Sequence, residues 1–231
     1  MHLYLANKLY SSWSMRPWLV MRHIGLDFEE AVIPLRREDT KARILEVSPS
    51  GKLPVLVLDN GVRVWDSMAI ISFLSDLYPD RPIWPESLAA RGHAKAICLE
   101  MHSGFQTLRQ ACPMNLGKRF KPRDFGHDVD ADVARISTIW RDTRERFGSK
   151  GPFLFGAFTA ADAVYAPVVN RLSAYGFKTD DDVRAYMDAI EGHTLYREWR
   201  DAGLAEPWHV PDYEEGHTVD QDLRADFQRS A

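Results

Sequence analysis

The sequence predicts a small α/β domain followed by a larger all-helical domain, and three observations support this division. Strand and helix signals alternate through the first 80 residues. The stretch "YPDRPIWPE" (78–86) then carries three prolines in nine residues, and strand signals are absent beyond it. Proline-rich stretches of this kind often mark a domain boundary. We therefore predict an α/β domain at 1–80, a linker at 81–87 and a helical domain at 88–231.

The first domain has the pattern of a βαβ unit followed by a helix, a hairpin and a last helix. The expected segments are a strand at 2–6, a helix at 15–23 that stops before Gly25, a strand at 28–35, a helix at 38–47, a hairpin within 53–65 and a helix at 67–79. Asn60-Gly61 inside the hairpin is a strong turn signal. A βαβ unit gives a parallel strand pair and a hairpin adds antiparallel strands. The order βαβ-α-ββ-α therefore predicts a mixed four-stranded sheet of the thioredoxin-like type.

The second part of the chain carries apolar residues at helical spacing. Three stripes follow this period: Ile97, Met101, Phe105, Leu108 and Cys112; Val133, Ile136, Trp140 and Phe147; Val164, Val168, Leu172 and Tyr175. Such stripes are typical of helices that bury one face. Cys98 and Cys112 are expected to be buried free thiols. The segment 207–231 is polar and punctuated by proline, and we expect a tail that wraps on the surface or is partly mobile.

Composition excludes several classes of function. The chain has 231 residues, a net charge of −4 and a pI near 6.1, which argues against a nucleic-acid partner or an anionic membrane surface. Its apolar runs are far shorter than the roughly 20 residues that span a bilayer. The N-terminus lacks the pattern of a secretory signal, so we expect a cytoplasmic protein. The sequence has no CxxC motif, and its histidines are scattered without the spacing of a metal site.

Two further motifs allow both a structural and a binding role. Pro54 stands just before the apolar run "VLV", and two explanations are open. It is simply the first residue of a strand, or the peptide bond between Leu53 and Pro54 is cis. A cis bond would leave the Leu53 backbone free to pair with a bound peptide. Ser67 is a helix N-cap by position. A helix N-terminus also attracts a carboxylate, and Asp66 beside it suits an ammonium group.

The stretch "YSSWSMRP" (10–17) holds three serines at the start of the first predicted helix. With Pro17 in the first helical turn, Ser14 is expected to be the N-cap. Ser11 and Ser12 would then lie in the preceding loop, at the positive end of the helix. A hydroxyl there can lower the pKa of a bound thiol.

Together these motifs resemble the glutathione transferase superfamily over nearly the whole chain. The resemblance rests on "YSSWSMRP", "SGKLPVL", "DSMAII" and "TAADAVYAP", which occur in the family's order and spacing. In the last of these, Thr159 and Asp162 form a capping box, which we interpret as structural. The serine-type, zeta-like classes are the most similar, although Trp13 stands where that group usually has cysteine.

The resemblance implies a metal-free, homodimeric detoxification enzyme that uses glutathione as a substrate. Ser11 would hydrogen-bond the thiolate, with Ser12 a close rival. The residues implied to hold the rest of glutathione are Trp13, Lys52, Leu53, Pro54, Asp66 and Ser67. The second substrate would be a largely apolar electrophile, and from the helical stripe we place it near Met101, Phe105 and Arg109.

Three other functions compete with this transferase. The same fold also serves non-catalytic glutathione-binding or regulatory proteins. A zeta-like maleylacetoacetate isomerase would need an arginine for the substrate carboxylate, and Arg171 is displaced from the position the group uses. A glutaredoxin-type oxidoreductase would need a cysteine at the first helix, where this chain has "SSWS".

Overall fold

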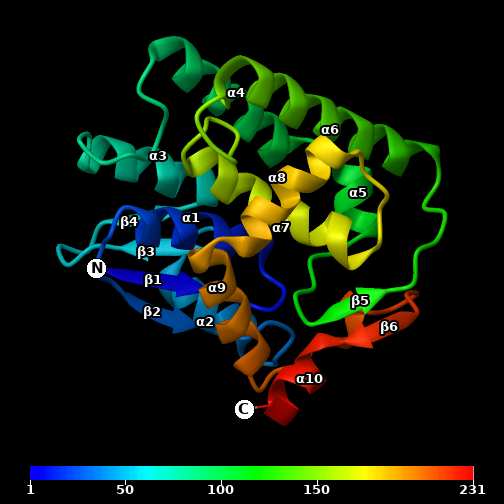
Figure 1. The fold of residues 1–231 in the computed structure, drawn as a ribbon. Coiled ribbons are helices and arrows are strands. Elements are labelled where there is room, and N and C mark those ends of the chain that lie inside the picture. The colour runs from blue at the N-terminus through cyan, green and yellow to red at the C-terminus, as the bar shows by residue number, and fades with distance from the viewer. Residues whose placement is uncertain (231) are drawn as a thin grey trace.

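The computed structural model describes residues 1–230 and begins with a four-stranded sheet (Figure 1). The strands are β1 (His2–Leu5), β2 (Glu29–Val32), β3 (Val55–Val57) and β4 (Arg63–Trp65). They lie in the order β2-β1-β3-β4. β1 is parallel to β2, whereas β3 is antiparallel to both β1 and β4. This is the mixed sheet that the sequence predicts.

Three helices complete the first domain: α1 (Ser12–His23), α2 (Thr40–Val47) and α3 (Ser67–Leu77). The predicted hairpin turn is present, with the Leu58 N–H donating to the Val62 carbonyl at 2.9 Å. Gly61 has φ of 85° there, a conformation that glycine adopts without steric cost. The Leu53-Pro54 peptide bond is cis, which is the second of the two possibilities left open by the sequence.

The first helix begins earlier than predicted. Ser11, not Ser14, is its N-cap, because the Ser14 N–H donates to Ser11 Oγ at 3.2 Å. Ser14 is fully buried, and its Oγ accepts the N–H of Ala6 at 3.0 Å just after β1. A tertiary contact of this kind is not visible in the local proline pattern on which the prediction relied. Pro17 therefore lies in the second turn of α1.

The third helix also differs at its start. Asp66 is the N-cap of α3, and its carboxylate accepts the N–H groups of Met68 and Ala69 at 2.8 and 3.2 Å. Asp66 has φ of 76°, which is uncommon for a residue with a side chain. Ser67, predicted as the cap, is the first helical residue instead.

The second domain is helical, and α7 lies at the centre of its helices. They are α4 (Leu88–Ser103), α5 (Gln106–Ala111), α6 (His127–Phe147), α7 (Ala160–Ala174), α8 (Asp181–Gly192) and α9 (Thr194–Ala205). Every residue of α7 except Ser173 is buried. This helix packs against α1 of the first domain as well as α4 and α8, so it joins the two domains in one core. Helices that are buried on all sides are expected only at such a centre.

The first predicted helical stripe crosses a break in the chain. α4 ends at Ser103 and α5 starts at Gln106, with Phe105 between them at φ of 57°. A Cβ on Gly104 would lie 2.7 Å from the Glu100 carbonyl oxygen, so only glycine fits this turn. The apolar period continues through the break because both helices face the same core.

The C-terminal segment, expected from sequence to wrap on the surface or to be partly mobile, contains regular secondary structure. It contains η1 (Pro211–Tyr213), β6 (Val219–Asp222) and α10 (Leu223–Ser230). β6 pairs antiparallel with β5 (Lys118–Phe120), which adds a small sheet to the helical domain; the two strands lie side by side in green and red in Figure 1. β6 is not recognisable as a strand from the sequence, because its residues are polar and largely exposed. Its pairing with β5 is supported by an ion pair from Lys118 to Asp222 at 2.5 Å.

Both cysteines are buried free thiols, as predicted. Burial raises the pKa of each thiol, which leaves both unreactive. Among residues 1–230, no helix is long and apolar enough to cross a bilayer.

Candidate active site between the two domains

Two adjoining cavities lie at the junction of the sheet domain with α4, α5 and the C-terminal segment. The larger, of about 480 Å³, reaches from the start of α1 to α5. The second, of about 470 Å³, extends toward the start of α3. Trp13, Lys52 and Leu53 line both cavities, so one extended ligand could occupy both. The first cavity also receives Ser11 and Ser12, and the second receives Pro54, Asp66 and Ser67.

Ser11 and Ser12 reach the larger cavity in different hydrogen-bonding states. Ser11 Oγ accepts the Ser14 N–H and donates to Ser14 Oγ at 2.8 Å. No hydrogen bond from the Ser12 hydroxyl to another described residue is present, and its side chain is also largely buried. Ser11 stands at the N-cap of α1, where the partial positive charge of the helix is concentrated.

The second cavity has the polar groups of an amino-acid site. The Ser67 hydroxyl is buried and finds no partner among residues 1–230. Asp66 faces His102 of α4, with 3.3 Å between Oδ2 and Nε2. Burial lowers the pKa of His102, an effect that Asp66 opposes, so the ring is largely neutral at pH 7. One carboxylate oxygen of Asp66 caps α3, and the other is left to meet a ligand ammonium group or His102.

Trp13 is held between two arginines at the boundary of the cavities. The guanidinium carbons of Arg16 and Arg109 each lie 4.5 Å from the Trp13 ring centroid, and His102 meets the ring edge at 5.1 Å. Each cation–π contact contributes about 0.5–2 kcal/mol. Trp13 is therefore a fixed wall, and it fills space that a cysteine at this position would leave open.

The larger cavity is positively charged at its helical side. Arg109 and Arg171 both line it, and neither forms an ion pair with a carboxylate of the described residues. Arg171 is 6% exposed, and its Nε has no partner within residues 1–230. Burial, with repulsion from Arg109, lowers the pKa of Arg171 to about 10, so it stays charged at pH 7. A buried cation without a counter-ion is costly, and an anionic ligand would relieve that cost.

The predicted co-substrate residues divide into one cavity residue and two core residues. Arg109 lines the larger cavity, but Met101 and Phe105 are 1% and 8% exposed and belong to the hydrophobic core. Helical periodicity identifies the buried face of a helix, and here that face points into the core.

Sequence reasoning missed several residues of the cavity. Arg171 could have been noticed as a charge inside an otherwise largely apolar helix. Tyr10 and Tyr213 also line the larger cavity, with ring centroids 5.0 Å apart. They are separated by about 200 positions in sequence, so no local pattern could have joined them.

Comparison with known proteins agrees with this fold and these motifs. Residues 10–77 match the family model of the glutathione S-transferase N-terminal domain, and residues 126–202 match that of the C-terminal domain. The chain is 32% identical to a zeta-class glutathione S-transferase of Euphorbia esula over 71% of its own length and 70% of the relative's. The chain therefore belongs to the glutathione S-transferase family of enzymes.

The similar proteins include several isomerases. The maleylacetoacetate isomerase of Pseudomonas aeruginosa is 24% identical over 92% of this chain and 98% of that protein. A probable maleylacetoacetate isomerase of Caenorhabditis elegans is 36% identical, and that match spans about half of each chain, 46% of this one and 48% of the relative.

Solved structures share the fold at lower identity. A glutathione transferase homolog of Burkholderia with bound glutathione has a TM-score of 0.67 at 20% identity, covering 89% of this chain and 98% of that one. A bacterial zeta-class maleyl pyruvate isomerase has a TM-score of 0.63 at 20% identity, covering 91% of this chain and 100% of that one.

Proposed function

We propose that this protein activates the thiol of glutathione through a serine hydroxyl and adds it to an electrophile that carries a carboxylate. The observation that carries the proposal is the pair Arg109 and Arg171, which lines the same cavity as Ser11 without a carboxylate partner among the described residues. The proposal differs from the sequence-based expectation of a largely apolar electrophile, because two cations favour an anionic substrate.

The glutathione molecule would span both cavities. The Leu53 backbone, ahead of cis-Pro54, would pair with its cysteinyl unit, and Lys52 would meet the glycyl carboxylate. Asp66 and the unpartnered hydroxyl of Ser67 would bind the γ-glutamyl ammonium and carboxylate groups, respectively. Trp13 would lie against the peptide at the boundary of the two cavities. This orientation directs the sulfur toward the N-cap of α1.

Ser11 is our candidate for the hydroxyl that contacts sulfur. Its oxygen accepts a backbone N–H, and hydroxyl groups rotate freely enough for Ser14 to become the donor to Ser11. The Ser11 hydroxyl proton is then free to donate to the thiolate. The Ser11 oxygen at the same time accepts two hydrogen bonds, from the Ser14 N–H and the Ser14 hydroxyl. Lowering a thiol pKa by about two units requires roughly 2.7 kcal/mol. One hydrogen bond to a charged group contributes about 1.5–3 kcal/mol, and the helix terminus adds about 0.3–1.

Isomerisation is the second candidate, and one observation favours it. The displaced sequence position of Arg171 argued against a carboxylate-binding isomerase, yet its side chain lies in the cavity wall. In that reaction the thiolate would add to a cis carbon–carbon double bond conjugated to a carbonyl, moving an electron pair onto the carbonyl oxygen. The new single bond rotates, and the thiolate leaves as the trans double bond re-forms. Glutathione is regenerated, which distinguishes this reaction from conjugation.

The test begins with glutathione affinity measured by calorimetry. Turnover is then followed with a panel of cis-unsaturated keto acids, such as maleylacetoacetate, and their methyl esters. Transfer consumes one thiol per substrate, whereas isomerisation leaves the free thiol concentration constant. Binding of glutathione without turnover of any acid in the panel would instead support the non-catalytic alternative and reject both reactions.

Arg171→Met gives a direct test of carboxylate recognition. We expect the KM for the acids to rise about 10- to 100-fold, because one charged hydrogen-bonding partner is worth about 1.5–3 kcal/mol. The KM for the methyl esters should change less than twofold, and glutathione affinity should be kept. Arg171→Lys should recover part of the loss. An equal effect on acids and esters would contradict a role in binding the carboxylate.

A further inference from the structure

The chain beyond α9 turns back toward the active site and is anchored at both ends. At its start, the Glu206 carboxylate accepts the Lys8 N–H at 2.7 Å, next to the loop that carries Ser11. At its end, β6 pairs with β5, and α10 packs against α9. Arg224 of α10 donates to the Glu206 carbonyl and so closes the segment into a loop. We call residues 206–222 the C-terminal strap.

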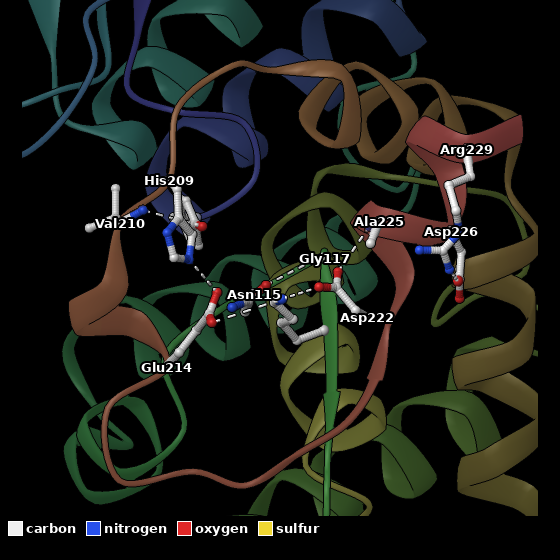
Figure 2. Close-up of polar contacts among 11 residues, drawn as sticks. Asn115, Gly117, His209, Val210, Glu214, Asp222, Ala225, Asp226 and Arg229 are labelled. Carbon is white, nitrogen blue, oxygen red and sulfur yellow. Dashed lines mark hydrogen bonds and ion pairs between the residues drawn. The ribbon is translucent and has the colours of Figure 1, made fainter. Parts of the chain in front are cut away.

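Polar contacts, among them ion pairs of Lys118, hold the middle of the strap in place. His209 Nε2 lies 2.9 Å from Glu214 Oε1, so the two sides of the turn are joined, as Figure 2 shows. Lys118 of β5 lies 4.0 Å from the other Glu214 oxygen and 2.5 Å from Asp222. Lys118 is 15% exposed, and its contacts are correspondingly less screened than those of a surface pair.

The strap brings η1 to the mouth of the larger cavity. The Val210 N–H donates to the Tyr10 hydroxyl at 3.4 Å, and the Tyr213 ring packs on the Tyr10 ring. On the other side, Asp212 pairs with Arg36, which precedes α2, at 3.1 Å. The strap therefore bridges the first domain and the small β5-β6 sheet across the cavity.

Tyr213 is the strap residue that enters the cavity wall, where Arg171 is also found. No hydrogen bond joins its hydroxyl to another residue of the described chain. Burial raises the pKa of Tyr213, so the phenol keeps its proton at pH 7 and is available as a donor.

We propose that the C-terminal strap forms one wall of the co-substrate site, where Tyr213 sets the size of the cavity and donates a hydrogen bond to the substituent carried by sulfur. This inference rests on the proposed function, because it assumes that glutathione binds with its sulfur toward Ser11. The favoured substituent is a short chain that ends in a carboxylate. The Tyr213 ring limits the space in the cavity, and Arg171 supplies a positive charge to bind the carboxylate.

The test compares ligands that differ only beyond the sulfur atom. Calorimetry would give the affinities of glutathione, S-methylglutathione, S-hexylglutathione and S-(2-carboxyethyl)glutathione for the wild type and for Tyr213→Ala and Tyr213→Phe. Glu215→Ala is the matched control, because Glu215 is an exposed strap residue outside the cavity wall.

For Tyr213→Ala we expect about a tenfold loss of affinity for the carboxyethyl ligand, with glutathione and S-methylglutathione within twofold of the wild type. Tyr213→Phe should keep S-hexylglutathione affinity but lose about fivefold for the carboxyethyl ligand, because only the hydroxyl is removed. Lys118→Met, which loosens the strap and keeps Tyr213, should weaken the same ligand relative to glutathione.

Other outcomes separate the two proposals. An equal loss for all four ligands would mean that Tyr213 has only a structural role, and unchanged affinities in all variants would exclude it from the site. Either result overturns the inference while glutathione binding by the wild type still supports the proposed function. A wild type that binds none of the four ligands overturns both.

Discussion

At the residue scale, Ser11 serves both the fold and the site. Its oxygen caps α1 by accepting the Ser14 N–H, and its side chain reaches the larger cavity. Ser14 connects this cap to the sheet, because its Oγ also accepts the Ala6 N–H next to β1. The position of the Ser11 hydroxyl is therefore fixed by hydrogen bonds that connect the start of α1 to Ala6 just after β1, which is the condition for a preorganised donor.

Ser11→Ala should raise the pKa of enzyme-bound glutathione by about one to two units, through loss of a charge-assisted hydrogen bond. The measurement is a pH titration of thiolate absorbance in the ultraviolet. Ser14→Ala should give a smaller rise, because it removes only the group that polarises Ser11. If Ser12→Ala raises this pKa and Ser11→Ala does not, Ser12 is the hydroxyl in contact with sulfur.

At the element scale, the start of α7 is the most strongly specified helix end in the chain. The predicted capping box is present, with the Thr159 N–H donating to Asp162 Oδ2 at 2.8 Å. Asp162 is fully buried and accepts three further hydrogen bonds, from the Thr159 hydroxyl, the Leu154 N–H and the Tyr186 hydroxyl. Because α7 joins both domains, its N-terminus affects the stability of the whole chain.

Asp162→Asn should lower the free energy of unfolding by about 3 kcal/mol, since an amide has one acceptor oxygen where the carboxylate has two. Chemical denaturation measures this loss, and Asp130→Asn in the exposed first turn of α6 is the control, with a change below about 0.5 kcal/mol. Glutathione affinity of the folded variant should be unchanged. A loss no larger than that of the control would contradict a structural role for the box.

The titration of Asp162 should also make the free energy of unfolding depend on pH. Burial raises the pKa of Asp162 to about 6 from an ordinary value near 4, so folding favours its protonated form. Its contribution to stability is fully present below about pH 4 and is lost as the pH rises through 6. The stability difference between the wild type and Asp162→Asn should therefore be larger at pH 4 than at pH 7, by up to about 3 kcal/mol. A difference that is independent of pH would contradict the shift.

At the scale of the whole molecule, exposed apolar side chains indicate a self-association surface beside the second cavity. Trp65 at the end of β4 is 44% exposed, and Leu99 on α4 is 53% exposed. Leu99 lies one helical turn before His102, which lines the second cavity together with Trp65. The homodimer remains a prediction, and we expect this surface to form its interface.

Leu99→Arg should shift the protein from dimer to monomer at micromolar concentration, as measured by light scattering, because a charge would be buried in the interface. Leu88→Arg is the control, since Leu88 is 83% exposed at the opposite end of α4. Equal masses for the wild type and both variants would exclude this surface as the interface.

The fold was predictable from sequence where the signals are local. The Asn60-Gly61 turn, the capping box at Thr159 and the alternation of strands and helices each depend on neighbouring residues. Predictions failed where a distant group decided the outcome, as for Ser14, which is drawn inside α1 by the Ala6 N–H. The β6 strand was missed for a similar reason, because its polar residues are held by Lys118, about 100 positions away.

Sequence patterns alone predicted the order of elements in the first domain, the family, and a group of polar residues that line the two cavities, namely Ser11, Ser12, Lys52, Asp66 and Ser67. These features depend on the spacing of residues within short segments, and that spacing is visible in the sequence itself. Tertiary structure alone decided that Ser11 is the helix cap, that Arg171 shares its cavity, and that Tyr213 closes one wall. The physical reason is that a cavity forms between elements, so its walls come from residues whose only relation is where the packed core places them.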